Sequence, residues 1–186
     1  MSKLKTTDKI IAAFVFVFIL LMGYLWFSPS GLKIAPSVEL TTISGEKLNL
    51  DTLKGKPVLV TFWATSCSGC IKEMPHLVEL HQKYAAQGLT IIGISMPYDR
   101  PDHVMKLAQQ KKLPYIIAMD INKQATIAFG DIRLTPTTFL IDPNGIIVKH
   151  KIGELNMPIV EQQIINLLAS APTTSLQPTN AVKKLN

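Results

Sequence analysis

The hydrophobic and polar positions of this chain form short apolar runs separated by stretches of helical periodicity. The apolar runs are rich in β-branched residues, which is typical of strands buried on both faces of a sheet. They cover residues 58–62, 89–95 and 115–119. Other stretches carry apolar residues at the spacing of one helix face. They cover the segment from the cysteine pair to Gly88 and residues 101–112, 125–130 and 158–168. Asn156 is the predicted N-cap of the last helix. This alternation of strand and helix predicts an α/β fold.

Two further regions predict antiparallel hairpins. Residues 38–50 contain two short strand patterns around the turn at Ser44–Gly45. Residues 137–141 and 146–150 flank the sequence Asp-Pro-Asn-Gly, which is a strong hairpin signal. Together with the buried strands, these hairpins predict a central mixed β-sheet flanked by helices, with a β-hairpin at its N-terminal end.

A different pattern lies at the N-terminus, where Ile10–Phe27 is apolar and uncharged throughout. As a helix rising ~1.5 Å per residue, a run of this length approaches the ~30 Å hydrocarbon core of a bilayer. Lys3, Lys5 and Lys9 precede it, and basic flanks favour the cytoplasmic side. The run therefore predicts a single-pass transmembrane helix in the inner membrane, with the N-terminus in the cytoplasm and the catalytic domain periplasmic or otherwise extracytoplasmic.

A cleaved signal peptide is the alternative interpretation, with Ser28–Ser30 as its cleavage site. Signal peptides have an apolar region of ~7–15 residues and small residues at the cleavage site, whereas this run is longer and ends in the bulky Trp26 and Phe27. A buried helix of a soluble domain is disfavoured because the run has no polar face. We therefore favour an uncleaved anchor, and both favoured interpretations place the domain in an oxidising compartment.

The composition divides the chain into segments. The net charge of +6 comes largely from lysines near the two ends, and there is no basic stripe with interleaved aromatic residues, so we predict no binding to nucleic acid. The C-terminal tail is rich in Thr, Pro, Ser and Asn, which predicts disorder. The predicted segments are a basic cytoplasmic N-terminus at 1–9, the anchor at 10–27, a linker at 28–35, one folded domain at 36–170 and the tail at 171–186.

The candidate chemistry lies in the two cysteines of the chain, Cys67 and Cys70. They follow a buried strand and open a helix, which places Cys67 at the helix N-terminus, where free N–H groups and the helix dipole stabilise a thiolate. Cys70 comes one helical turn later, close enough to attack a mixed disulfide formed by Cys67. Gly69 leaves the space between the two sulfurs uncrowded. The pair predicts two-step thiol–disulfide exchange without a cofactor.

Two other interpretations of the cysteine pair are weaker. A closed zinc site needs two further ligands at suitable spacing, and the chain has no other cysteine and no HxxxH pair among its histidines, so we predict no metal site. A pair of buried, inert thiols is disfavoured by the position between strand and helix.

The segment Trp63–Cys70, with the sequence WATSCSGC, resembles the active-site signature of the thioredoxin superfamily. The closer resemblance is to the TlpA/ResA-like membrane-anchored thiol–disulfide oxidoreductases, and it extends over roughly residues 35–170. It includes Leu53–Pro57, before the first buried strand, and Thr135–Asp142. The resemblance implies a thioredoxin-like fold with an extra helix–strand insertion within residues 98–121.

The resemblance also implies a substrate-binding surface. Thr135 and Pro136 resemble the loop whose cis-proline lies opposite the cysteines, and the backbone of Thr135 is expected to bind an extended substrate segment by strand addition. Trp63 is expected to shield Cys67, with core packing as the alternative. Ser66 stands where a tryptophan often precedes the first cysteine, and this departure is expected to loosen or repolarise the surface.

Glu73 stands where the TlpA/ResA-like group often carries an acidic residue near the active site. The superfamily archetype has a buried aspartate six residues before its first cysteine, where this chain has Thr61, which cannot accept a proton at neutral pH. We therefore expect Glu73 to take the proton from Cys70 during exchange. That role needs burial and a raised pKa, and a solvated helix glutamate is the alternative.

The implied function is a reductase of protein disulfides outside the cytoplasm, as in cytochrome c maturation. The implied partners are a protein disulfide as substrate and a membrane-embedded thiol–electron transporter as reductant. A disulfide oxidase or isomerase of the same fold is the second hypothesis. A copper-binding chaperone that uses the soft thiolates of Cys67 and Cys70 for Cu(I) is the third.

Overall fold

The computed structural model describes residues 14–20, 22 and 34–170. The chain forms two units, Met1–Leu32 and Lys33–Asn186. In the first unit the described residues are helical and exposed. Among the residues that the structure describes, no helix combines the length and the apolar character that a membrane crossing requires.

Several predicted segments lie wholly or partly outside the described residues. The anchor predicted at 10–27 is described only in its middle part, and the linker at 28–35 only at its end. The basic N-terminus predicted at 1–9 and the tail predicted at 171–186 are outside altogether. These four segments remain predictions.

The second unit is built on a seven-stranded mixed sheet with the strand order β2-β1-β5-β4-β3-β6-β7. Strands β3, β4 and β5 run parallel to one another, and the remaining pairs are antiparallel. The sheet confirms each strand that the sequence predicted. The strands are β1 Glu39–Thr42, β2 Lys47–Asn49, β3 Val58–Trp63, β4 Thr90–Ser95, β5 Ile116–Met119, β6 Thr137–Ile141 and β7 Ile147–Ile152.

The helices also lie where the periodicity placed them. They are α2 Ser68–Tyr84, α3 Pro101–Gln110, α4 Gln124–Ala128 and α5 Met157–Ser170, with short 3-10 turns η1 Leu50–Leu53 and η2 Ala85–Gln87. Gly88 has a positive φ of 112°, a backbone conformation that glycine adopts at low cost and that ends the helical segment. The amide of Ile159 donates to Asn156 Oδ1 at 3.3 Å, which confirms the predicted cap of α5.

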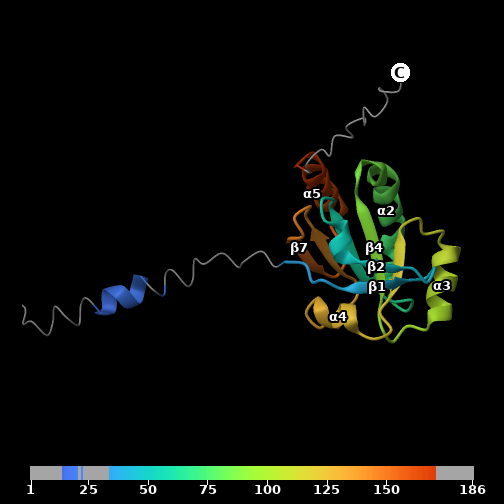
Figure 1. Ribbon diagram of the computed structural model, residues 1–186, viewed down its shortest axis with the longest axis horizontal. Helices are drawn as coiled ribbons and strands as arrows, with labels where there is room; N and C mark the ends of the chain where they lie inside the picture. Colours follow the sequence, from blue (N-terminus) through green and yellow to red (C-terminus); the bar gives the residue numbers. More distant parts are fainter. Residues whose placement is uncertain (1–13, 21, 23–33, 171–186) are drawn as a thin grey trace, which may run out of the picture. The chain divides into compact units, whose positions relative to one another are not determined.

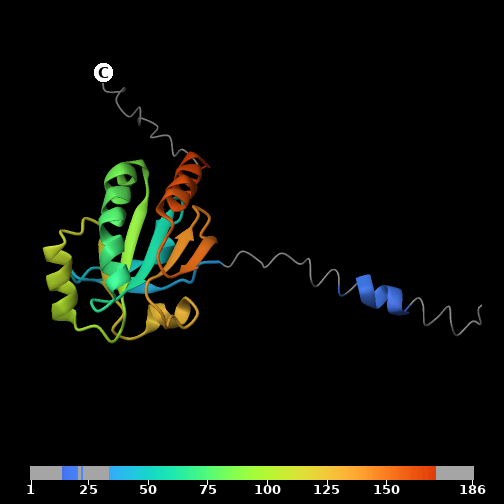
Figure 2. The ribbon, with the colours of Figure 1, turned by 180° about the vertical axis from the view of Figure 1, so that it is seen from behind.

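The sheet separates two hydrophobic clusters. Successive residues of β3 point to opposite faces, so Leu59 and Trp63 pack with α2, α3 and α5, whereas Val60 and Phe62 pack on the side of α4. Figures 1 and 2 show the sheet from opposite directions, with α4 at one end of the view and α2 and α5 at the other. Burial of β3 on both faces explains why its sequence is an unbroken apolar run.

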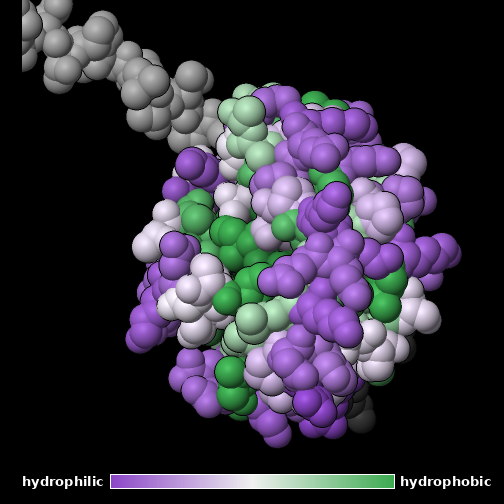
Figure 3. All heavy atoms as spheres, turned by 90° about the vertical axis from the view of Figure 1, so that its right-hand side faces the viewer, coloured by the Kyte–Doolittle hydropathy of each residue, from purple (hydrophilic) through white to green (hydrophobic). Residues whose placement is uncertain are grey.

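Helix α3 has one face buried in the core and one face exposed to solvent. Val104 and Ala108 lie in the core, while Asp102 and Lys106 are exposed. On the face that carries α3, hydrophilic side chains predominate, and hydrophobic ones gather mainly in a hollow (Figure 3). The amphipathic pattern of the sequence therefore matches the burial of this helix.

The parallel strands place the functional loops together. Because β3, β4 and β5 are parallel, their carboxyl ends meet at one edge of the sheet, where ligand-binding and catalytic loops of α/β folds commonly lie. The cysteine loop follows β3 there, and the loop containing Asp99 follows β4.

Candidate active site

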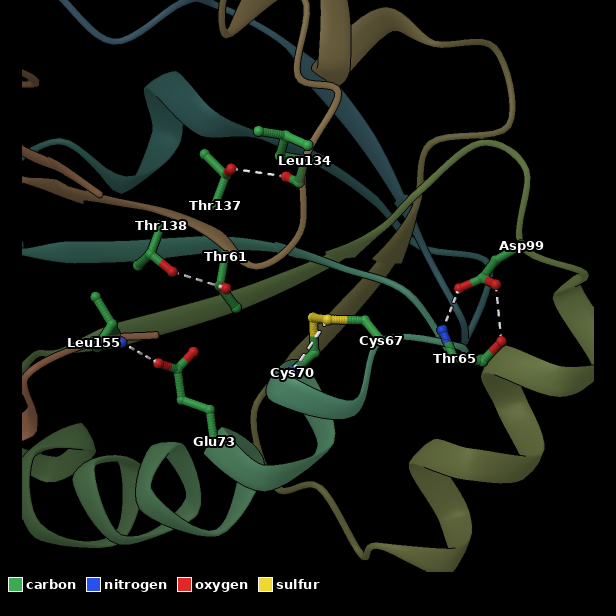
Figure 4. Close-up of a disulfide and its surroundings, with 10 residues drawn as sticks. All are labelled: Thr61, Thr65, Cys67, Cys70, Glu73, Asp99, Leu134, Thr137, Thr138 and Leu155. Carbon is green, nitrogen blue, oxygen red and sulfur yellow. Dashed lines mark hydrogen bonds between the residues drawn. A yellow bond between two sulfur atoms is a disulfide. The ribbon is translucent and has the colours of Figure 1, made fainter. Parts of the chain in front are cut away.

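Cys67 and Cys70 form a disulfide at the start of α2, with Cα atoms 5.3 Å apart (Figure 4). Cys67 is the N-cap residue of α2, and its Sγ accepts a hydrogen bond from the Cys70 amide at 3.1 Å. Cys67 is half-buried, whereas Cys70 is only 3% exposed. Of the two cysteines, Cys67 is therefore the one that an incoming disulfide can reach.

Asp99 fixes the loop that leads to Cys67. Its carboxylate accepts hydrogen bonds from the Thr65 amide at 2.7 Å and from the Thr65 hydroxyl at 2.8 Å. Hydrogen bonds to an ionised acceptor are roughly twice as strong as neutral ones. Figure 4 shows this contact on the Cys67 side of the disulfide. Sequence patterns did not point to Asp99, because its contact with Thr65 joins two separate loops.

The loop before β6 lies against the cysteine loop. The peptide bond between Thr135 and Pro136 is cis, as the resemblance implied. A Cβ added to Gly69 would lie 3.7 Å from Pro136 Cδ, so the proline ring stands beside the residues between the two cysteines. The amide of Gly153 donates to the Pro136 carbonyl at 2.8 Å, and this bond joins the loop to the end of β7.

Glu73 follows Cys70 by one turn of α2 and is buried, with 5% of its surface exposed. The amide of Leu155 donates to Glu73 Oε1 at 2.6 Å. Burial raises the pKa of the Glu73 carboxyl above its ordinary value; the Leu155 amide and His76 oppose this rise, and the negative charge of Glu154 adds to it. Burial excludes the solvated helix glutamate that was the alternative.

A second carboxylate, that of Glu154, stands over the cysteine loop. A Cβ added to Gly69 would lie 3.5 Å from Glu154 Oε1, so the Glu154 side chain lies within van der Waals reach of position 69. Lys72 Nζ donates to Glu154 Oε2 at 3.0 Å. The pair is exposed, and exposed ion pairs contribute only ~0–1 kcal/mol to stability. The sequence did not reveal Glu154 as a neighbour of the dithiol.

Thr61 forms a neutral contact under the site. Its hydroxyl lies 3.0 Å from the hydroxyl of Thr138 on β6, and both residues are buried. The position where the superfamily archetype has an aspartate is thus filled by a hydrogen-bonded hydroxyl pair. Neither hydroxyl can act as a base at neutral pH.

Trp63, at the end of β3, is 3% exposed and packs in the same hydrophobic cluster as Cys70. Its indole Nε1 is buried and has no hydrogen-bond partner among the described residues. The side chain therefore lies in the core together with Cys70 and not on the surface around the cysteines.

The residues at the site offer no ready metal centre. Within the described ranges, no group of three or more His, Cys, Asp or Glu side chains could hold a metal ion. The chemistry that this arrangement supports is carried by two sulfur atoms and a nearby carboxyl group.

A thioredoxin-like α/β fold that presents a CxxC pair in this way defines the class of thiol–disulfide oxidoreductases, whose substrates are disulfides of other proteins. The sequence of residues 32–150 matches the model of the AhpC/TSA family, and the chain belongs to this family.

Individual relatives agree with this class. The chain is 38% identical over 123 residues to the thiol-disulfide oxidoreductase ResA of Bacillus thuringiensis. This alignment covers 66% of this chain and 69% of that protein. It is 35% identical to protein DipZ of Mycobacterium bovis over 71% of this chain but 19% of that protein. A thiol:disulfide interchange protein of the thioredoxin family from Chlorobium tepidum superposes with a TM-score of 0.68 at 26% identity, covering 76% of this chain and 99% of that structure. The predicted resemblance to ResA-like enzymes is confirmed.

Proposed function

We propose that this thiol–disulfide oxidoreductase reduces protein disulfides outside the cytoplasm, with Cys67 as the attacking thiolate and Cys70 as the resolving thiol. The observation that carries this assignment is the difference in access between the two cysteines. Cys67 is half-buried at the helix N-terminus, where a thiolate is stabilised, and Cys70 is enclosed in the core.

The proposed reaction has two balanced steps. In the first, the Cys67 thiolate attacks one sulfur of the client disulfide, the client S–S bond breaks, and a client thiolate leaves. In the second, Cys70 loses its proton and attacks Cys67 Sγ, which releases the second client thiolate and forms the Cys67–Cys70 disulfide. The client gains two electrons and the enzyme loses two, so a thiol reductant must restore the dithiol before another turnover.

Three further residues are given roles in this proposal. Glu73 accepts the Cys70 proton in the second step, supported by its burial and by its place one turn from Cys70. Thr135 presents its backbone to an extended client segment beside Pro136, supported by the contact of Pro136 with the cysteine loop. Trp63 shields the dithiol from below, supported by its packing in the cluster of Cys70.

The charges around the dithiol favour the reducing direction. Strongly oxidising exchange proteins are oxidants because their reduced form is stabilised. A positive environment stabilises the thiolate and therefore the reduced form. Here two carboxyl groups, those of Glu73 and Glu154, lie close to the cysteine loop, and Lys72 is already paired with Glu154. This arrangement opposes a strongly stabilised thiolate and so opposes a strongly oxidising potential.

The reduction potential of the Cys67–Cys70 pair tests the direction. We expect a value below about −250 mV, near the ~−270 mV of thioredoxin, when the chain is equilibrated with dithiothreitol or glutathione buffers and its thiols are trapped. A potential near ~−120 mV would mark an oxidant, and one near ~−180 mV an isomerase. Either result would contradict the reductase assignment while leaving exchange chemistry intact.

We also propose that Ile10–Phe27 anchors the chain in the inner membrane, with the domain on the outer side and a membrane-embedded thiol–electron transporter as reductant. The support is the length of the uncharged run and its lysine flank. We expect the full chain to stay in the membrane fraction after an alkaline wash and a variant without Ile10–Phe27 to be released. Release of the full chain in a shortened form would show cleavage instead.

A further inference from the structure

The loops after β3 and β4 are tied together by the side chain of Asp99. Strands β3 and β4 are parallel neighbours, with Trp63 opposite Ser95, so the two loops leave the sheet side by side. The Met96 amide donates to the Trp63 carbonyl at 2.9 Å, which extends this pairing past the end of the strands. Beyond it, Asp99 bonds to Thr65 through both oxygens of its carboxylate (Figure 4). The cysteine loop is therefore held by a residue from outside its own motif.

This contact lies directly before the reactive cysteine. Thr65 donates its amide to Asp99 Oδ2 and its hydroxyl to Asp99 Oδ1. The Cys67 amide donates to the Ala64 carbonyl at 3.1 Å, so the chain from Ala64 to Cys67 forms a turn with Thr65 inside it. Asp99 is itself held, since its amide donates to the Met96 carbonyl at 3.0 Å. A shift of Asp99 would therefore move the turn that carries the Cys67 sulfur.

The negative charge of Asp99 is not paired with a cation. Arg100, the next residue, donates to Asp102 at 3.1 and 2.9 Å instead. Asp99 forms no ion pair with any residue in the described part of the chain. Because two residues of chain span at most ~7 Å, a carboxylate bonded to Thr65 lies on the order of 10 Å from Cys67. At such a distance, one negative charge disfavours a second one on the sulfur.

We infer that Asp99 is a positioning residue with two separable effects on Cys67: its hydrogen bonds hold the sulfur for attack, and its charge disfavours the thiolate. This inference rests on the proposed role of Cys67 as the attacking thiolate and adds a residue from outside the cysteine motif to that reaction. The other charged groups around the dithiol are Glu73 and Lys72 on α2 and Glu154 after β7. Asp99 differs from them because it comes from the loop after β4 and contacts the chain before Cys67.

Two substitutions of Asp99 separate the hydrogen bonds from the charge. Asp99→Asn removes the charge but keeps an oxygen for the Thr65 amide and offers an amide N–H to the Thr65 hydroxyl oxygen. Asp99→Ala removes the charge and both hydrogen bonds. The thiolate fraction of Cys67 is read from the pH dependence of alkylation of the reduced full chain by iodoacetamide, with mass spectrometry to identify the alkylated residue. The rate of attack is measured as formation of the mixed disulfide with insulin in the Cys70→Ser background, and it is expressed per thiolate.

The two measurements should respond differently. Both variants should have an about threefold larger thiolate fraction at neutral pH, because each lacks the same unit charge. The rate per thiolate should fall about tenfold in Asp99→Ala, since small misplacements of a reacting group are costly, and should stay within about twofold in Asp99→Asn. Should Asp99→Ala fail to fold, Thr65→Val, which loses only the hydroxyl bond, takes its place with an expected fall of about threefold.

The control is Asp102→Asn, which makes the same change at an exposed position in the first turn of α3, where the carboxylate is paired with Arg100. It should alter neither quantity. A thiolate fraction that is unchanged in both Asp99 variants, or that rises equally in Asp102→Asn, would overturn the charge effect. An unchanged rate per thiolate in Asp99→Ala or Thr65→Val would overturn the positioning effect. Failure of insulin to form any mixed disulfide with Cys67 of the unaltered loop would instead contradict the proposed function, and the alkylation measurement would still test Asp99.

Discussion

A serine in place of Cys70 should arrest the reaction half-way and accumulate a covalent complex with the client, whereas a serine in place of Cys67 should stop it before any bond forms. The reason is the difference in access, since Cys67 is half-buried and Cys70 is 3% exposed. Both variants should lose turnover by more than about a thousandfold, as expected when the reacting nucleophile is removed. Non-reducing gel electrophoresis and mass spectrometry would identify the complex.

The matched control is Ser68→Ala, which changes the exposed first residue of α2 and should leave turnover within about twofold. A client complex that accumulates on Cys70 when Cys67 is replaced would reverse the assigned roles. Circular dichroism of each variant separates loss of chemistry from loss of fold, because Cys70 also packs in the core.

The fold was predictable because its main elements are encoded locally. The apolar run at Val58–Phe62 predicted a strand buried on both faces, and β3 has core clusters on both sides. The turn signals at Ser44–Gly45 and at residues 142–145 predicted both hairpins correctly. The order of strands in the sheet has no such local signal, because it depends on which faces are covered after the chain has folded.

The candidate site also has features that a local motif encodes and features that depend on contacts between distant residues. The cysteine pair and its place at a helix N-terminus follow from a contiguous motif, and the cis bond before Pro136 followed from the resemblance to a known family. The contact of Leu155 with Glu73 joins residues 82 positions apart, and that of Asp99 with Thr65 joins residues 34 apart. Such contacts have no periodic pattern in the sequence, so Leu155 and Asp99 do not stand out as neighbours of the site before the fold is known.

Replacement of Glu73 by glutamine should lower the rate of client release at neutral pH by roughly a hundredfold, at the lower end of the range for loss of a general base. Glutamine keeps the acceptor oxygen for the Leu155 amide but cannot take a proton from Cys70. The rate of the unaltered enzyme should rise with pH as Glu73 ionises, at an apparent pKa above that of an ordinary glutamate, because burial raises the pKa. That rise should be missing in the variant. Stopped-flow measurement of the second step across pH gives both quantities.

The raised pKa of Glu73 predicts that the stability of the fold falls with pH, whereas the activity rises. A carboxyl group whose pKa is raised by folding binds more protons in the folded than in the unfolded state between its ordinary pKa, about 4.3, and the raised value. The free energy of unfolding therefore falls as pH increases through this window, and Glu73→Gln should remove that fall. The variant should be less active yet more stable than the unaltered chain above the window.

Glu79→Gln, the same change at an exposed position of α2, should alter neither rate nor stability. A stability difference that stays constant with pH, together with an unchanged pH–rate profile, would show that Glu73 is not the proton acceptor and that its burial serves only the contact with Leu155.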